Sequence, residues 1–266
     1  MSAKEFDPHL RKMDDELAGW SEPAERLRHA LANDELALYC QPIAALGGGA
    51  PGYPMAEVLV RLHEEEKALL PPGEFLPVFE HYRLMPDLDR WVLRKVLEHL
   101  AGDRTIPRFS INVSSQTLED AAFPQAAAQG LAAAGVPASA LLFEIGEADA
   151  LLRPELSLRF ANAMRAVGCG LMVGGFGRRA ATFMPLKTLA PGFVKVDGVI
   201  VRKLLAAPAA EAKLKAIIRV AEVMRFQIIA EMVEEPEILA RLKQLGVAYA
   251  QGFGVRRPLP IERLRG

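Results

Sequence analysis

The chain has 266 residues, of which 51% are hydrophobic and 24% are charged, with a formal net charge of −1 at pH 7. This balance allows one large core or two small ones, and it argues against broad electrostatic capture of nucleic acid or anionic membrane. A local basic site for a small phosphate ligand is compatible with it. No apolar run reaches membrane-spanning length, and the N-terminus has no signal-peptide core. We therefore expect a cytoplasmic protein or a soluble piece of a longer one, and we interpret Cys40 and Cys169 as small buried hydrophobes in a reducing compartment.

Residues 1–22 are charged and weakly periodic, which predicts a solvated helix or a linker, and residues 23–266 are expected to form one domain. The segment "PAERLRHALAN" has helical spacing, with Pro23 suited to the first turn and Asn33 to the end. Eight short strand-like runs then alternate with helical segments such as "PDLDRWVLRKVLEHLA" and "EAKLKAIIRVAEVMR"; the runs are 36–43, 55–62, 108–113, 141–145, 171–174, 193–197, 227–233 and 249–252. This rhythm predicts an α/β fold of the (βα)8 barrel type, with an open doubly wound sheet as the alternative.

Polar side chains stand among apolar neighbours near the ends of these runs. In "AEVLVRL", alternation places Glu57, Leu59 and Arg61 on one face, and five further strands contribute Asn112, Glu144, Lys195 with Asp197, Glu231 and Gln251. Ionisable groups inside a sheet are costly unless they are paired, so packing alone does not explain so many of them. Acidic and amide oxygens suit Mg²⁺ or Mn²⁺, and lysine and arginine suit a phosphate. The residues thus predict a phosphoryl-binding, metal-dependent pocket.

The run "GLMVGGFGRR" is the exception, because it ends in Gly174 and Gly175 where carboxylates would complete a two-metal site. The spacing of these glycines matches no dinucleotide-binding fingerprint. For the arginines that follow, Arg178 and Arg179, two readings stay open: a solvated loop, or contacts to a ligand phosphate or to an acidic patch of a partner.

Several blocks, taken in order, resemble the EAL domain, the family of cyclic di-GMP phosphodiesterases. They are "YCQPI", "AEVLVR", "PPGEFLPVFE", "DRWVLRKVLEHL", "INVSSQTLED", "LLFEIGE", "VKVDGVIVR", "IIAEMVEE" and "YAQGFGVRRPLP", which together extend from about residue 24 to the C-terminus. The resemblance implies a (βα)8-type barrel whose first strand runs antiparallel.

The resemblance also implies roles for individual residues. Glu57, Asn112, Glu144 and Glu231, with Asp197 nearby, look like metal ligands of the family. Lys195 looks like the residue that orients the attacking water, Gln251 like its helper, and Glu147 like the carboxylate that braces the loop after the fifth strand. The implied ligand contacts are Gln41, Glu57, Leu59, Arg61, Asn112, Glu231, Met232, Glu234, Gln251, Arg257 and Pro258, with Arg61 on a phosphate and Met232 under a guanine base.

The departures from the family decide the expected activity. The Asp-Asp pair of the family's Asp-Asp-Phe-Gly-Thr-Gly motif is replaced by Gly174 and Gly175. A two-metal mechanism without these carboxylates loses its nucleophile and its charge clamp. Removing two negative charges also reduces repulsion of a ligand's phosphates. We therefore expect no phosphodiesterase activity, and binding of cyclic di-GMP that needs no metal or other cofactor.

Among such degenerate EAL domains, "EVL" with "GGFG" and "AEMVE" most resembles the C-terminal domain of FimX-type regulators of type IV pili and twitching motility. That resemblance implies a receptor that signals to a PilZ-domain protein, with residues 1–22 continuing from an upstream domain. Two alternatives stay open: weak phosphodiesterase activity through one metal held by Asn112, Glu144, Glu231 and Asp197, or a protein scaffold without nucleotide binding. With the loop rewritten as "GRRAATF", we expect the chain to be a monomer.

Overall fold

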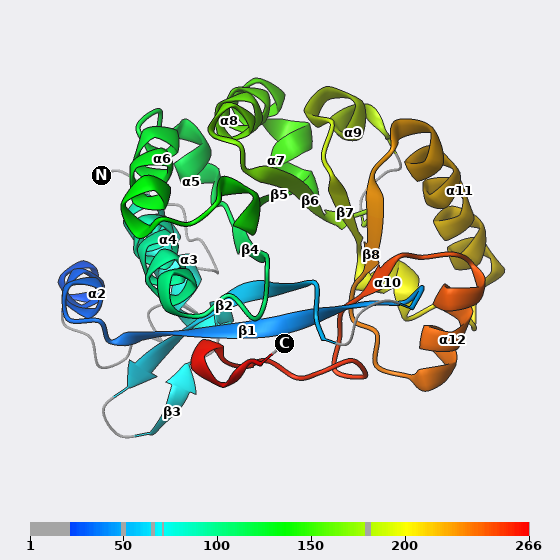
Figure 1. The fold of residues 1–266 in the computed structure, drawn as a ribbon, viewed down its shortest axis with the longest axis horizontal. Coiled ribbons are helices and arrows are strands. Elements are labelled where there is room, and N and C mark those ends of the chain that lie inside the picture. Colours follow the sequence, from blue (N-terminus) through cyan, green and yellow to red (C-terminus); the bar gives the residue numbers. More distant parts are fainter. Residues whose placement is uncertain (1–21, 49–51, 65–66, 71, 179–181, 266) are drawn as a thin grey trace, which may run out of the picture.

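A computed structural model describes residues 22–48, 52–64, 67–70, 72–178 and 182–265. The segment 1–22 was expected to be a helix or linker, and residues 1–21 of it lie outside the described residues. Eight strands close into a barrel (Figure 1): β1 (Leu36–Ala45), β2 (Met55–Glu64), β4 (Phe109–Asn112), β5 (Leu141–Gly146), β6 (Gly170–Phe176), β7 (Phe193–Val196), β8 (Gln227–Ala230) and β9 (Tyr249–Ala250). The predicted (βα)8 barrel is confirmed, and closure between β1 and β2 excludes the open doubly wound sheet.

The first strand runs against the rest of the barrel. β1 pairs antiparallel with β2 on one side and with β9 on the other, while neighbours from β2 round to β9 are parallel. The antiparallel first strand that the resemblance implied is therefore confirmed. Because of this direction, the carboxyl ends of the parallel strands lie beside the middle of β1, where Gln41 pairs with Glu57.

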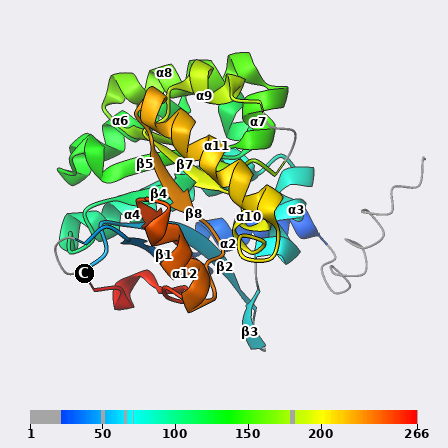
Figure 2. The same cartoon turned by 90° about the vertical axis from the view of Figure 1, so that its right-hand side faces the viewer.

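Two short strands lie outside the barrel and were not predicted. β3 (Lys67–Leu70) pairs antiparallel with β2, and β10 (Leu259–Pro260) pairs antiparallel with β1. The hairpin of β2 and β3 projects away from the barrel in Figures 1 and 2. The predicted strand 227–233 is too long, since β8 ends at Ala230 and Met232 adopts a left-handed φ of 54° that no strand continues.

Helices form the outer layer (Figures 1 and 2). They are α2 (Pro23–Ala32), α3 (Pro72–His81), α4 (Met85–Gly102), α5 (Ser115–Glu119), α6 (Phe123–Ala134), α7 (Glu147–Leu152), α8 (Pro154–Val167), α9 (Met184–Leu189), α10 (Gly198–Val201), α11 (Pro208–Met224) and α12 (Pro236–Gln244). Proline in the first turn recurs in α2, α4, α6, α8 and α11, where its missing N–H costs no intrahelical bond. The predicted helix from Pro23 to the Asn33 cap is confirmed.

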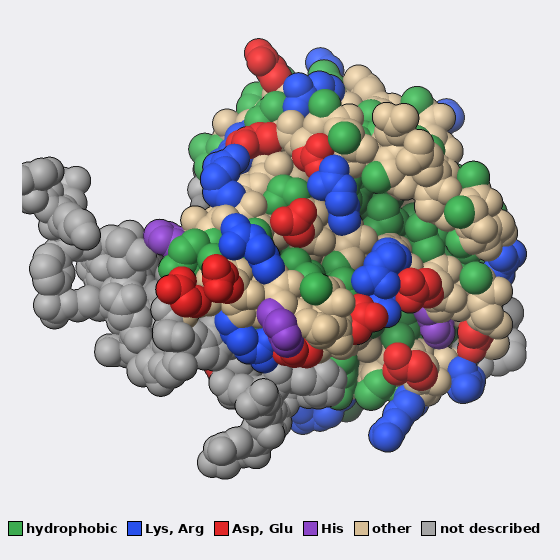
Figure 3. Space-filling model, turned by 90° about the vertical axis from the view of Figure 1, so that its left-hand side faces the viewer, with side chains coloured by type: hydrophobic (Ala, Val, Ile, Leu, Met, Phe, Trp, Pro, Cys, Tyr) green, Lys and Arg blue, Asp and Glu red, His purple; other side chains and the backbone are tan. Residues whose placement is uncertain are grey.

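Among the described residues, none of the helices has the length and apolar character to cross a bilayer. On the face over α2 to α6, lysine and arginine side chains are interspersed with aspartate and glutamate (Figure 3). Cys40 and Cys169 are both buried and free, and burial raises the pKa of each thiol to about 12.

The apolar core has two parts, separated by the barrel wall. The larger part lies between strands and helices and includes Phe109, Phe143, Val173 and Val194. The smaller part fills the barrel interior and consists of Ile43, Met55, Leu142, Met172, Phe193 and Ile229, with Tyr249 packed against it. This second cluster forms a floor beneath the carboxyl ends of the strands.

Candidate functional site

A polar layer lies directly above this apolar floor. Side chains alternate between the two faces of a strand, so the next inward-facing residue stands two positions further along. Each floor residue of a parallel strand is therefore followed by a residue of the upper layer: Met55 by Glu57, Leu142 by Glu144, Met172 by Gly174, Phe193 by Lys195, Ile229 by Glu231 and Tyr249 by Gln251. In antiparallel β1 the order is reversed, with Gln41 two positions before Ile43. Only β6 contributes a glycine to this set.

Lys195 is the centre of the polar layer. Its Nζ atom lies 2.8 Å from Glu57 Oε2, 3.1 Å from Glu144 Oε2 and 3.3 Å from Glu231 Oε1, and its side chain is 1% exposed. Lys195, Glu57, Glu144 and Glu231, with Asn112 and Gln251, are called the Lys195 cluster below. One ammonium group thus faces three carboxylates: two come from β2 and β5, and the third, Glu231, directly follows β8.

The charges of this cluster are strongly coupled. Burial alone would lower the pKa of Lys195, but Glu144, Glu57 and Glu231 raise it well above its usual value. Burial also opposes ionisation of Glu57, yet the charge and hydrogen bond of Lys195 bring the pKa of Glu57 below its usual value. In contrast, burial raises the pKa of Glu144 to about 8 and also raises the pKa of Glu231. The ion pair at neutral pH is therefore centred on Lys195 and Glu57.

Amide side chains complete the hydrogen bonds of Glu57. Asn112 Nδ2 donates to Glu57 Oε1 at 2.8 Å, and Gln251 Nε2 donates to Glu57 Oε2 at 2.6 Å. The same Gln251 nitrogen lies 3.1 Å from Gln41 Oε1, and Gln41 Nε2 donates to the carbonyl of Arg256 at 3.1 Å. The polar layer thus connects the seam between β1 and β9 to the segment that carries Arg257 and Pro258.

The two glycines near the end of β6, Gly174 and Gly175, differ in the space around them. A Cβ atom at position 174 would lie 2.1 Å from Glu144 Oε1, so the Glu144 side chain fills the space that a residue larger than glycine would need. Gly175 has a φ of +63°, and a Cβ atom at this position would meet no atom nearer than Asp197 Oδ2, at 3.8 Å. Position 174 is therefore closed by packing, whereas position 175 is open but requires a left-handed backbone.

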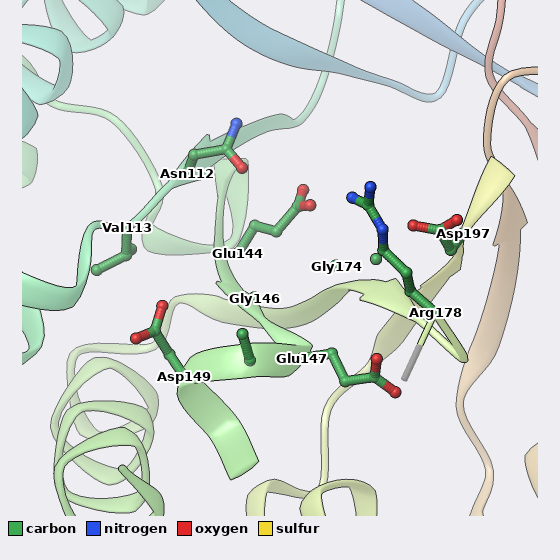
Figure 4. A pocket seen from close by; sticks show the side chains of 11 residues that line it. Asn112, Val113, Glu144, Gly146, Glu147, Asp149, Gly174, Arg178 and Asp197 are labelled. Atoms are coloured by element: carbon green, nitrogen blue, oxygen red, sulfur yellow. The ribbon is translucent and has the colours of Figure 1, made fainter. Parts of the chain in front are cut away.

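A cavity of about 450 Å³ opens beside these glycines (Figure 4). We call it the acidic pocket; it is lined by Asn112, Val113, Glu144, Gly146, Glu147, Ala148, Asp149, Gly174, Gly175, Arg178 and Asp197. Three of its carboxylates bond to the protein: Glu147 accepts from Gly177 N at 2.9 Å, Asp149 from Ser115 Oγ at 2.7 Å and Asp197 from Val199 N at 2.7 Å. Glu147 thus braces the loop after β6, as the resemblance implied.

These residues do not fit a pair of divalent cations. Among the described residues, no group of three or more His, Cys, Asp or Glu side chains is arranged to hold a metal ion. Lys195 occupies the centre of the glutamates, Asp197 caps α10, and the Glu144 side chain stands where residue 174 would place a ligand. Two-metal hydrolysis needs oxygen ligands for both ions, and the end of β6 supplies none from its side chains.

A second cavity, of about 240 Å³, lies beside Leu59 and brings in a residue that sequence reasoning missed. This Leu59 cavity is lined mainly by apolar residues, but Asp89 of α4 is also part of its wall. Asp89 Oδ2 accepts from Ser114 N at 3.0 Å, and burial raises the pKa of Asp89. The available signal was a carboxylate on the apolar face of α4, next to Leu88 and one turn before Leu93.

Other predicted ligand contacts lie outside the Lys195 cluster. Arg61 donates to the Val60 carbonyl at 2.8 Å, and its guanidinium carbon lies 5.5 Å from the centre of the Tyr39 ring. Arg257 lies over the exposed ring of Phe253 at 4.5 Å. The side chains of Met232 and Glu234 are exposed, and Met232 packs against Gly198. Leu59 belongs to the second cavity.

Comparisons with known proteins agree with this architecture. The model of the EAL domain family matches residues 24–258. The cyclic di-GMP phosphodiesterase PdeB of Shewanella oneidensis is 32% identical over 241 residues, which is 90% of this chain but 28% of that protein. The chain spans about a third or less of this relative and of similar ones, such as PdeF of Escherichia coli at 32% of its length.

Solved structures give the same result. The FimX EAL domain from Pseudomonas aeruginosa bound to c-di-GMP has a TM-score of 0.83 and 28% identity, covering 90% of this chain and 96% of that one. The PaMucR phosphodiesterase in its c-di-GMP complex has a TM-score of 0.82 and 27% identity, covering 91% of this chain and 99% of that one.

Proposed function

Because this chain belongs to the EAL domain family, we propose that it is a cytoplasmic receptor for cyclic di-GMP that does not hydrolyse its ligand. The observation that carries the proposal is the contrast between an intact polar layer on the other strands and the glycine end of β6. Glu57, Asn112 and Gln251 stay connected by hydrogen bonds, while Gly174 and Gly175 offer no ligand to a metal. Relatives that bind c-di-GMP in solved structures include the FimX EAL domain and PaMucR.

The lining of the Leu59 cavity supports a purine nucleotide as the ligand. The Leu59 cavity offers apolar walls for a base, and its one buried acid, Asp89, suits the N–H donors on the edge of a guanine. Arg61 lies on the same face of β2 as Glu57 and Leu59 and suits a phosphodiester. Neither contact needs a metal ion, so we expect binding that does not depend on divalent cations.

The proposal includes a protein partner. The resemblance of "EVL", "GGFG" and "AEMVE" to FimX-type regulators supports a role in type IV pilus and twitching-motility signalling through a PilZ-domain protein. The structural likeness to the FimX EAL domain is consistent with that resemblance. Copurification of the chain with such a protein, in the presence and absence of cyclic di-GMP, tests this step by itself.

Calorimetric titration with cyclic di-GMP in EDTA tests the binding. We expect saturable heat from the wild-type chain, and loss of affinity of at least about tenfold in Arg61→Ala, because a hydrogen bond to a charged group contributes about 1.5–3 kcal/mol. Arg28→Ala, which removes an exposed arginine on α2, is the matched control and should bind like the wild type. No heat from the wild type, with or without Mg²⁺, would contradict the receptor function and leave a scaffold.

A further inference from the structure

The turn after β6 is built to direct one side chain toward the acidic pocket. Gly175 and Gly177 both have left-handed backbones, with φ of +63° and +87°, and the buried ring of Phe176 anchors the residue between them. A Cβ at position 177 would lie 2.7 Å from Ile200 Cδ1, so this position also requires glycine for space. Arg178 is the next residue, and its direction follows from these constraints.

The backbone of Gly177, the residue just before Arg178, is held on both sides of its Cα. The N–H of Gly177 donates to Glu147 Oε1 at 2.9 Å, and the Gly177 carbonyl accepts from Lys213 Nζ. Glu147 belongs to α7 and Lys213 to α11, so two helices hold the two peptide units that flank the Gly177 Cα. A side chain that starts from a fixed backbone loses less conformational freedom when it binds a ligand.

Arg178 carries the basic group of the acidic pocket. Figure 4 shows its guanidinium directed between the carboxylates of Glu144 and Asp197, beside Gly174. Among the described residues that line this cavity, Arg178 is the only Lys or Arg, and its guanidinium makes no hydrogen bond or ion pair within that part of the chain. By contrast, the carboxylates of Glu147, Asp149 and Asp197 already accept hydrogen bonds from the protein.

We propose that Arg178 is the cation of this site, and that its guanidinium binds a phosphodiester of the nucleotide beside Gly174 and Gly175. This inference rests on the proposed receptor function and adds the group that makes it independent of metal. A guanidinium presents five N–H donors in a planar fork, so one edge can face the carboxylates while another bonds the phosphate. The room for the phosphate and the guanidinium lies at Gly175, where a Cβ would meet no atom nearer than Asp197 Oδ2 at 3.8 Å.

Titration of four chains with cyclic di-GMP tests the inference: wild type, Arg178→Ala, Arg178→Lys and Arg219→Ala. Arg219 is an exposed arginine on α11, so its loss is the matched control for the change in net charge. In EDTA we expect Arg178→Ala to bind about 10- to 100-fold more weakly than the wild type, because it loses charge-assisted hydrogen bonds. Arg178→Lys should lie between them, since lysine keeps the charge but not the fork.

Repetition of the titrations with Mg²⁺ separates a ligand contact from a structural role. We expect added Mg²⁺ to recover part of the affinity of Arg178→Ala and to change that of the wild type by less than about threefold, because a cation is missing only in the variant. Equal affinity of Arg178→Ala, Arg219→Ala and wild type would overturn this inference alone. Absence of binding by the wild type in both buffers would overturn the proposed function and this inference together.

Discussion

The end of β6 differs from the ends of β5 and β7 beside it. On β5 and β7, the inward-facing Glu144 and Lys195 lie 3.1 Å apart, in the cluster whose ion pair joins Lys195 to Glu57. On β6, the corresponding residue is Gly174, and the Glu144 side chain fills the space that a Cβ there would need. The difference teaches that one strand end of this barrel can lack a polar side chain while the polar layer of its neighbours is assembled. The proposed function, binding without hydrolysis, depends on this contrast.

The largest loss of stability is expected when Lys195, the centre of the Lys195 cluster, is replaced. Lys195→Met removes the ammonium that faces three carboxylates, and breaking a buried ion pair in this way costs about 3–5 kcal/mol of unfolding free energy. Urea denaturation of the variant measures this loss. Lys187→Met removes an exposed lysine of α9 and should change the free energy by less than about 0.5 kcal/mol. Similar stability of both variants would show that the cluster is not held by its central charge.

The glycine side is tested by adding one methyl group at each of its two positions. Gly174→Ala should destabilise the fold by about 1–3 kcal/mol, because its Cβ would overlap the Glu144 carboxylate. Gly175→Ala has room for its Cβ and pays only for the left-handed backbone, about 1 kcal/mol. Combining Gly174→Ala with Glu144→Ala should cost less than the sum of the two single changes. Additive costs would contradict the idea that Glu144 fills the vacated space.

The pH dependence of the unfolding free energy tests the opposite pKa shifts of Glu144 and Glu57. The pKa of Glu144 is raised to about 8 in the folded protein, so the proton it holds stabilises the fold fully below the ordinary pKa of 4.5, and this contribution is lost as the pH rises through 8. Glu57 behaves oppositely, because its lowered pKa adds stability that is lost at acidic pH. We expect unfolding free energy to fall by about 1–3 kcal/mol between pH 5 and about 8 in the wild type. Glu144→Gln should flatten this slope, and an unchanged slope would assign the titration to another group.

A smaller effect, on ligand affinity, is expected at Asp89 in the wall of the Leu59 cavity. Asp89→Asn keeps the size of the side chain but changes its pattern of donors and acceptors beside the Leu59 cavity. We expect the affinity for cyclic di-GMP to fall by about three- to tenfold, with less loss for an adenine analogue than for the guanine ligand. Calorimetry with both nucleotides measures the ratio. The same loss for both bases would mean that Asp89 acts through the Ser114 backbone and not on the base.

Much of the barrel could be predicted from the sequence because a two-residue period is a local property. Alternation in "AEVLVRL" and "LLFEIGE" placed Glu57 and Glu144 on inward faces, and the floor of Met55 and Leu142 beneath them confirms it. The short strands β3 and β10 could not be found this way, since four and two residues carry too little periodicity. The early end of β8 depends on the positive φ of Met232, which a residue other than glycine seldom adopts.

The candidate site was predictable in its members but not in its contacts. The sequence suggested that Glu57, Asn112, Glu144, Glu231 and Lys195 meet, and the structure brings them together around Lys195. It could not indicate that the Glu144 carboxylate fills the space beside Gly174, because that depends on a rotamer set by three-dimensional packing. Nor could it place Arg178, whose direction depends on two left-handed glycines and on the bonds from Glu147 and Lys213.

The most direct test of the central claim is a search for turnover under conditions that favour it. The purified chain is incubated with cyclic di-GMP and either Mg²⁺ or Mn²⁺, at a concentration that saturates the binding measured in EDTA, and the nucleotides are separated by chromatography. The account predicts that bound cyclic di-GMP is recovered intact in both metals. Linear dinucleotide that forms in proportion to the protein, and that disappears in Glu57→Gln, would contradict it and show that the remaining strand ends suffice for catalysis.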